Sequence, residues 1–273
     1  MPIQATYRED ARNQARNANG LENRGQRVTA VRGTFRQDPS QDHSPTRSGD
    51  RHRFLDCGAV NVRTITHGRY RTNTYIADDG VSGNALLIDP TENPDGCIEV
   101  ATSAGLQITA IVATHSHFDH IGGVAGVAKQ LRVPFLIGRH ALDSLHREPQ
   151  RARETGVEIA DPPEPDRLLD DGDWIEIGGL RFQTLYTPGH WQGDICLHEP
   201  IAKVVFTGDC LHHGKIGRYN EGCNEEELLR SIKAKLLPLP DETVVYSGHG
   251  AVTTIGEERV NNRDLLGLPR LPE

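Results

Sequence analysis

The sequence predicts an α/β protein in which strands and helices form layers. Short runs rich in Val and Ile, such as residues 108–115 and 203–209, have the length and composition of buried strands. Segments of helical length, including 120–132 and 140–156, lie between such runs. Strands and helices that alternate along one chain favour a layered α/β domain over an all-helical or all-β one.

The remaining elements follow in chain order. Alternating polar and apolar residues predict two strands in the first part of the globular region, at 61–68 and 69–78. A helix is expected at 97–104, a strand at 133–139, hairpins at 174–190 and 194–209, and a final strand at 243–250. A helix is also expected at 224–239, with Asn224 as its N-cap and acidic residues in its first turn.

Composition divides the chain into two regions. Residues 1–52 are rich in Arg, Asn, Gln, Ser and Gly, contain no Lys, and show no sustained apolar period. Such a segment buries too little apolar surface to fold, so we expect a disordered N-terminal arm. Residues 53–273 are expected to form the globular domain.

Charge and hydropathy exclude several classes of partner. The formal net charge is −8, whereas nucleic-acid-binding proteins usually carry a basic face. No window holds 18 apolar residues, and the first residues lack the apolar stretch of a secretory signal. The five cysteines are scattered without a CxxC pair, which favours a reducing compartment. We therefore expect a cytoplasmic protein that contacts neither nucleic acid nor membrane, of undetermined oligomeric state.

Metal-binding residue types collect at the ends of predicted strands. Three histidines and an aspartate stand within the six residues 115–120, namely His115, His117, Asp119 and His120. Three histidines at fixed positions would occur by chance on the order of 10⁻⁴ per window. Three further candidates close later strands, each beside a glycine: His190, Asp209 and His249. Imidazole and carboxylate in this mixture suit zinc, iron or manganese better than calcium or magnesium.

The other histidines are weaker candidates. His67, His140 and His198 stand alone, and isolated histidines are usually surface or core residues. Thr114 and Ser116 flank His115 and could orient an imidazole from behind. Trp191 follows His190 and is expected to pack in the core.

Four motifs, in order and spacing, resemble the metallo-β-lactamase superfamily over residues 59–262: THSHFDHIGG, TPGH, FTGD and SGHG. Within it, the stretches around TPGHWQGDICLH and FTGDCLHHGKIGRYNEG resemble the glyoxalase II (hydroxyacylglutathione hydrolase) branch and its shorter bacterial relatives. The resemblance implies a four-layer αβ/βα sandwich with two divalent metal ions, zinc first and iron or manganese as alternatives. It implies hydrolysis of a small thioester or ester by a metal-bridging hydroxide.

The resemblance also assigns roles to residues of this chain. It implies that His115, His117 and His190 hold one ion, that Asp119, His120 and His249 hold the second, and that Asp209 bridges both. Asp119 and Asp209 are therefore the predicted catalytic carboxylates, and Arg218 is the predicted substrate contact.

The sequence departs from full-length glyoxalase II in three places. The family's C-terminal helical domain, which holds glutathione, is not expected after Asn262. Asn220 stands where a tyrosine is usual, although Arg218 matches the family's basic residue. Cys210, His212 and His213 occupy a stretch that is more often small and apolar, and the two histidines could line the cleft.

Two rival functions use the same fold. Persulfide dioxygenases bind one iron through positions that match His115, His190 and Asp209. That family typically has Ala where this chain has Phe118, and Thr-Gly where it has Gly122-Gly123, which favours the hydrolase. A lactonase or other ester hydrolase on the same two ions is the second alternative.

Overall fold

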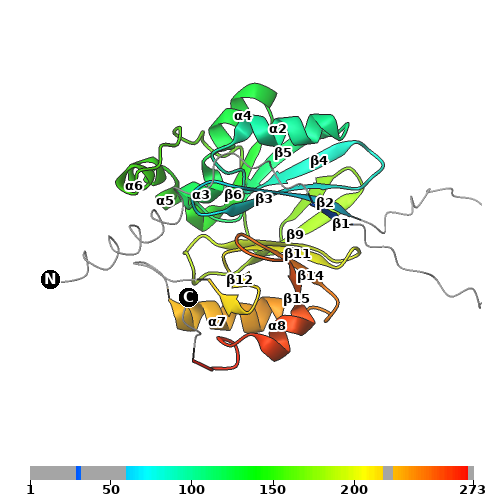
Figure 1. The fold of residues 1–273 in the computed structure, drawn as a ribbon, viewed down its shortest axis with the longest axis vertical. Helices are drawn as coiled ribbons and strands as arrows, with labels where there is room; N and C mark the ends of the chain where they lie inside the picture. Colours follow the sequence, from blue (N-terminus) through cyan, green and yellow to red (C-terminus); the bar gives the residue numbers. More distant parts are fainter. Residues whose placement is uncertain (1–28, 32–59, 218–223, 270–273) are drawn as a thin grey trace, which may run out of the picture.

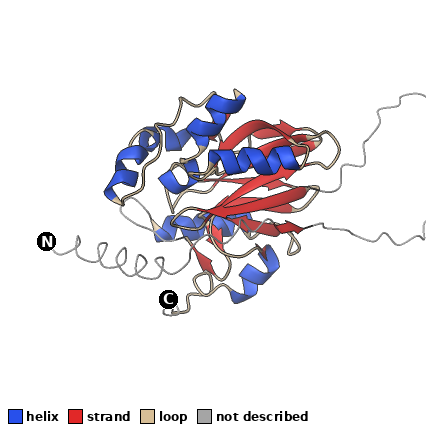
Figure 2. Cartoon of the chain, turned by 45° about the horizontal axis from the view of Figure 1, so that its top comes forward, coloured by secondary structure: helices blue, strands red, loops and turns tan. Residues whose placement is uncertain are grey.

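The computed structural model describes residues 29–31, 60–217 and 224–269. Two large sheets lie face to face, with helices on the outer face of each (Figures 1 and 2). The order from top to bottom of Figure 1 is therefore helix, sheet, sheet, helix. This arrangement confirms the expected α/β four-layer sandwich.

The first sheet has seven strands in sequential order, β1 to β7. Its strands are β1 (Thr29–Val31), β2 (Asn61–His67), β3 (Thr72–Asp78), β4 (Asn84–Ile88), β5 (Gln107–Ala113), β6 (Phe135–Gly138) and β7 (Arg167–Leu169). Neighbours from β1 to β4 are antiparallel, and neighbours from β4 to β7 are parallel. Helices α2 (Pro94–Ser103) and α4 (Val124–Leu131) connect these parallel strands.

The second sheet has six strands in the order β15-β14-β11-β10-β9-β8. They are β8 (Trp174–Ile177), β9 (Leu180–Tyr186), β10 (Ile195–Glu199), β11 (Val204–Gly208), β14 (Val244–Ser247) and β15 (Thr253–Thr254). Helices α7 (Glu225–Ser231) and α8 (Ile255–Asn261) cover its outer face, as Figure 1 shows. A small hairpin, β12 (Leu211–His212) with β13 (Lys215–Ile216), follows β11.

Side-chain alternation along the strands produces the layers. On β4, Leu86 and Ile88 join the core between the sheets, whereas Ala85 and Leu87 pack toward the helices. A strand sends successive side chains to opposite faces, so a strand covered on both sides is expected to be mostly apolar. All five residues of β10 and of β11 are buried, although β10 ends in the polar residues His198 and Glu199.

Several predicted boundaries were wrong. The helix expected at 140–156 is three short pieces: η1 (Arg139–Ala141), α5 (Leu142–Leu145) and α6 (Glu148–Glu154). The helix expected at 120–132 begins earlier, as α3 (Phe118–Ile121), and resumes as α4 after Gly122 and Gly123. The helix at 224–239 ends as a π-helical segment, η2 (Ile232–Leu236), while Asn224 caps its start as predicted.

The N-terminal arm lies mostly outside the described residues. Within it, the structure describes strand β1 (Thr29–Val31), which pairs antiparallel with β2. For the rest of residues 1–52, and for the boundary at 53, the expectation stays a prediction. Among the described helices, none combines the length and apolar character needed to cross a bilayer.

Candidate metal centre

All seven predicted ligands come together where strands of both sheets end. His115 and His117 follow β5, and Asp119 and His120 stand on the short helix α3. From the second sheet, the contributing residues follow three strands: His190 after β9, Asp209 after β11 and His249 after β14. Parallel strands β11 and β14 end at the same edge, which places Asp209 beside His249.

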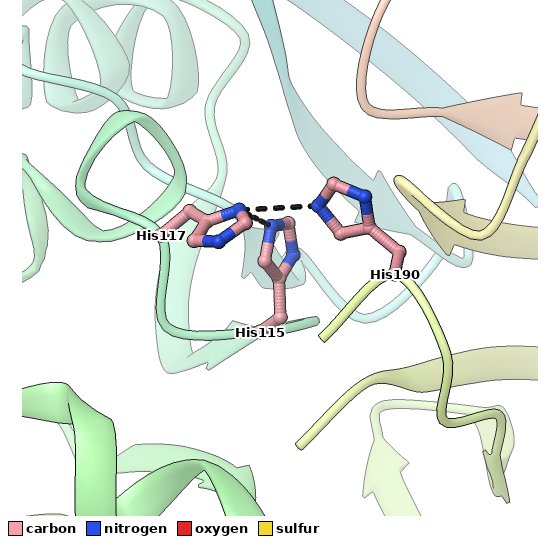
Figure 3. A group of neighbouring side chains, drawn as sticks. All are labelled: His115, His117 and His190. Carbon is pink, nitrogen blue, oxygen red and sulfur yellow. Dashed lines mark hydrogen bonds between the residues drawn. The ribbon is translucent and has the colours of Figure 1, made fainter. Parts of the chain in front are cut away.

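Three ring nitrogens face one another on one side of the centre. His117 Nδ1 lies 3.0 Å from His115 Nε2 and 3.1 Å from His190 Nε2, as Figure 3 shows. A neutral imidazole has only one donor and one acceptor nitrogen, so a single Nδ1 cannot serve both neighbours well. A cation that accepts a lone pair from each ring resolves the conflict, and these three atoms form a group able to hold one.

Carboxylates and imidazoles form the other side. His249 Nε2 lies 3.4 Å from Asp119 Oδ2 and 3.3 Å from Asp209 Oδ2. His120 Nε2 lies 3.5 Å from Asp209 Oδ1, and this buried nitrogen has no hydrogen-bond partner in the described residues. Buried polar atoms are normally paired, so an unpaired ring nitrogen aimed at two carboxylates fits a cation. Asp209 also lies 3.7 Å from His190 Nε2, so it faces both sides of the centre.

The shifted pKa values of the buried histidines and aspartates show that the centre favours a bound positive charge. Burial lowers the pKa of His115 and His117 well below the usual value, which leaves their lone pairs available. Burial alone would raise the pKa of Asp119 and Asp209, but neighbouring histidines outweigh it and lower both pKa values. Burial likewise opposes protonation of His249, yet Asp209 and Asp119 raise its pKa to about 10. Two ionised carboxylates among buried rings therefore create a strong demand for cations.

A second set of contacts fixes the orientation of the rings. Asp89 closes β4, and its Oδ2 lies 3.0 Å from His120 Nδ1 and accepts a 2.8 Å hydrogen bond from Thr114 Oγ1. The Tyr70 carbonyl oxygen lies 3.1 Å from His249 Nδ1. Such partners fix the tautomer and turn the other nitrogen of each ring toward the centre. Thr72 Oγ1 donates to Asp119 Oδ2 at 2.7 Å, which holds this carboxylate in place.

Backbone at Gly248 approaches the centre closely. A Cβ atom at this position would lie 2.3 Å from Asp209 Oδ1 and 2.6 Å from His120 Cε1. Only glycine allows Asp209 and His120 to occupy these positions. The glycine beside His249 is therefore part of how the centre is built.

The weaker candidates divide clearly. Thr114 contacts His115 Nδ1 at 3.1 Å, as expected of a residue behind a ligand, but Ser116 bonds Ser144 instead. His212 is buried with Nε2 3.3 Å from Asp209 Oδ1, whereas His213 is exposed. The Trp191 ring lies 4.7 Å from the His117 ring, so this residue borders the centre and does not sit in the core.

The remaining candidates lie elsewhere. His67 and His140 are exposed, and His198 is buried on β10, so none joins the centre. Arg218, the predicted substrate contact, lies outside the described residues. Asp89, Thr72 and Tyr70 were missed. The available signal was Asp89, a charged residue at the end of the apolar run ALLI.

Comparison with known proteins agrees with this geometry. The family model of the metallo-β-lactamase superfamily matches residues 67–249, which include every residue of the centre. The chain is 35% identical to hydroxyacylglutathione hydrolase GloC of Haemophilus influenzae, over 74% of this chain and 97% of that protein.

Two solved structures have the same architecture. The BLEG-1 B3 metallo-β-lactamase is 34% identical, with a TM-score of 0.68, and the match covers 75% of this chain and 99% of that one. TTHA1623 in a di-iron-bound form is 36% identical, with a TM-score of 0.67, and the match covers 73% and 98% respectively. The centre, the four layers and these matches together show that the chain belongs to the metallo-β-lactamase superfamily.

Proposed function

We propose that this protein is a metal-dependent hydrolase that cleaves a small thioester of the hydroxyacylglutathione type. The observation that carries the proposal is the convergence of seven candidate donors from both sheets in three overlapping groups of three. The relative named hydroxyacylglutathione hydrolase, which matches almost over its whole length, supports the choice of substrate class.

The donor set fits two divalent ions. His115, His117 and His190 would hold one ion, and Asp119, His120 and His249 would hold the other, with Asp209 between them. Zinc is the first choice for this donor set, and iron and manganese are alternatives. The di-iron-bound form of TTHA1623 supports iron as an alternative. When bound, such ions supply an activated water near neutral pH and a Lewis acid for the acyl oxygen.

The chain's own residues have two tasks in this reaction. Asp209 faces both groups of donors and so fixes the spacing of the two positions. Asp89 and the Tyr70 carbonyl keep Nε2 of His120 and His249 directed inward. A thiolate leaves readily, so the reaction does not need a general acid beside the leaving group.

The test combines metal analysis with turnover. We expect about two zinc, iron or manganese ions per chain and hydrolysis of S-lactoylglutathione or a simple acyl thioester. His120→Ala should remove one ion and abolish turnover, whereas His67→Ala, at an exposed position, should change neither.

Other results would redirect the proposal. One iron per chain, no thioester hydrolysis and oxygen consumption with a persulfide would overturn the hydrolase in favour of the dioxygenase. Two ions without thioester hydrolysis would overturn the thioester class and favour lactones or other esters.

A further inference from the structure

A cavity of about 240 Å³ opens beside the metal centre. Its walls come from the segment η1-α5-α6 and from the residues that follow His190. In Figure 1, α5 and α6 lie beside α3, the helix that carries Asp119 and His120. The residues that matter most for its chemistry are Ser144, Arg147, Glu148, Arg151 and Trp191.

Trp191 connects this cavity to the centre. One side of its ring meets the His117 ring at 4.7 Å, and the Arg151 guanidinium lies 4.8 Å from the ring centroid. Its Nε1 donates to Ser144 Oγ at 2.9 Å, which fixes the indole. The Trp191 ring therefore lies between the Arg151 guanidinium and His117, a predicted metal ligand.

The two arginines can bind an anion. Arg151 Nη1 pairs with Glu148 Oε1 at 3.1 Å, and its Nε and Nη2 have no hydrogen-bond partner within 60–217 and 224–269. Arg147 is exposed, and its Nε and Nη2 donate to the carbonyl oxygen of Asp143. A carbonyl does not neutralise a guanidinium, so the charge of Arg147 stays available.

Two acidic residues of the cavity, Asp143 and Glu148, reduce the positive potential of the arginines but do not cancel it. Glu148 is buried, and burial raises its pKa to about 7 although Arg151 and the Phe118 amide act against the rise. Glu148 therefore ionises less readily than an exposed glutamate, and its carboxyl group is already engaged by Arg151 and the Phe118 amide. The Asp143 carboxylate is exposed, where water screens it.

We propose that this cavity is a subsite that binds a carboxylate of the acyl carrier, with Arg147 and Arg151 as its anion-binding groups. The inference rests on the proposed thioester hydrolysis and adds the place where an acidic end of the carrier thiol would bind. Guanidinium binds carboxylate in a bidentate geometry, and Trp191 gives the carrier's stem an apolar wall.

Size and reach agree with such a carrier. The cavity of about 240 Å³ has room for a carboxyl group and the short chain that carries it. An extended chain spans about 3.5 Å per residue, so a carboxylate two residues from the thioester would lie roughly 7 Å away. The His117–Trp191 contact of 4.7 Å and the Trp191–Arg151 contact of 4.8 Å place the guanidinium no more than about 10 Å from the His117 ring, within reach of such a carrier.

The experiment uses the metal-loaded full chain and two matched substrates. One is S-lactoylglutathione, and the other is the same thioester with both carboxylates converted to amides. The variants are Arg147→Gln and Arg151→Gln. The control is Arg153→Gln, which changes an exposed arginine of α6 that does not line the cavity.

We expect each of the two variants to raise KM for the carboxylate substrate about tenfold, as for loss of one charged hydrogen bond. Their kcat, and every constant for the amide substrate, should stay near wild type. Arg153→Gln should behave as wild type with both substrates. Equal KM changes for both substrates, or a wild type that does not distinguish them, would overturn the subsite.

Binding separates failure of the subsite from failure of the hydrolase. S-methylglutathione has no thioester, and its binding and that of its diamide are measured by calorimetry. Carboxylate-dependent binding that Arg147→Gln weakens would support the subsite even if no thioester were hydrolysed. Equal binding of the acid and the diamide would reject it.

Discussion

The two halves of the centre are built in different ways. The first sheet supplies four donors from six consecutive residues, His115 to His120, and the local backbone alone holds them near one another. The second sheet supplies His190, Asp209 and His249 from the ends of three different strands. These residues are separated by 19 and then by 40 positions in the sequence. The donors from the first sheet are placed by the short turn and helix that follow β5. The donors from the second sheet are placed by the order in which its strands lie side by side. A substitution at a residue that contacts donors from both sheets should therefore cause the largest loss of metal and activity.

The largest effect is expected at Asp209, which faces both groups of donors. Asp209→Ala should lower the metal content from two ions to one or none and reduce turnover by at least about 1000-fold, more than loss of an outer partner. Metal analysis and a thioester assay measure both effects. Asp171→Ala, an exposed acid paired with Lys235, is the control. Retention of two ions in Asp209→Ala would contradict this role.

Removal of the metal ions should lower the thermal stability of the protein, because the ions would join residues of the two sheets. A ligand present at about 1000 times its Kd stabilises the folded state by about 4 kcal/mol. For a domain of this size, each kcal/mol corresponds to roughly 2–4 °C in Tm. Dialysis against a chelator should therefore lower Tm by about 10 °C, and zinc, iron or manganese should restore it. An unchanged Tm after verified metal loss would show that the two sheets do not need the ions.

A substitution at Asp89 tests the support of His120, because Asp89 contacts the ring nitrogen that faces away from the centre. Its two carboxylate oxygens accept from the Thr114 amide at 2.7 Å and contact His120 Nδ1 at 3.0 Å. Asp89→Asn keeps the size and tolerates the φ of 51° at this position. We expect a 10–100-fold loss of affinity for one ion, measured by competition with a coloured chelator. Asp95→Asn on the exposed face of α2 should leave the affinity unchanged.

Tyr75 joins the two sheets without joining the metal centre. Its buried hydroxyl donates to the Ser247 carbonyl oxygen at 2.6 Å. Tyr75→Phe should cost about 1 kcal/mol of unfolding free energy, since Asn73 Nδ2 still donates to that carbonyl. Urea denaturation measures the loss, and metal content should not change. Tyr186→Phe, which removes a hydroxyl bond at the surface, should cost less.

The smallest effect is a pH dependence at the loop after β3. Burial tends to raise the pKa of Asp79, but hydrogen bonds from Ser82, Val81 and Gly179 outweigh it and lower the pKa. A lowered pKa contributes stability above the unfolded value near 4, and this contribution is lost as pH falls through the folded value. Asp79→Asn should make the decline in stability below pH 4 shallower. An identical acid profile would contradict the linkage.

The sequence by itself determined the layered α/β class and predicted the seven candidate donors that the fold brings together. His115, His117, Asp119 and His120 could be recognised because their spacing is local, and strand ends marked His190, Asp209 and His249. Tertiary structure decided which residues stand behind the rings. Asp89 reaches His120 across 31 residues, and the Tyr70 carbonyl reaches His249 across 179. Periodicity describes one element at a time, so it could not reveal such contacts between elements. The sequence likewise did not reveal that residues 140–156 form three short pieces, with Arg151 against the Trp191 ring and Arg147 on the wall of the same cavity.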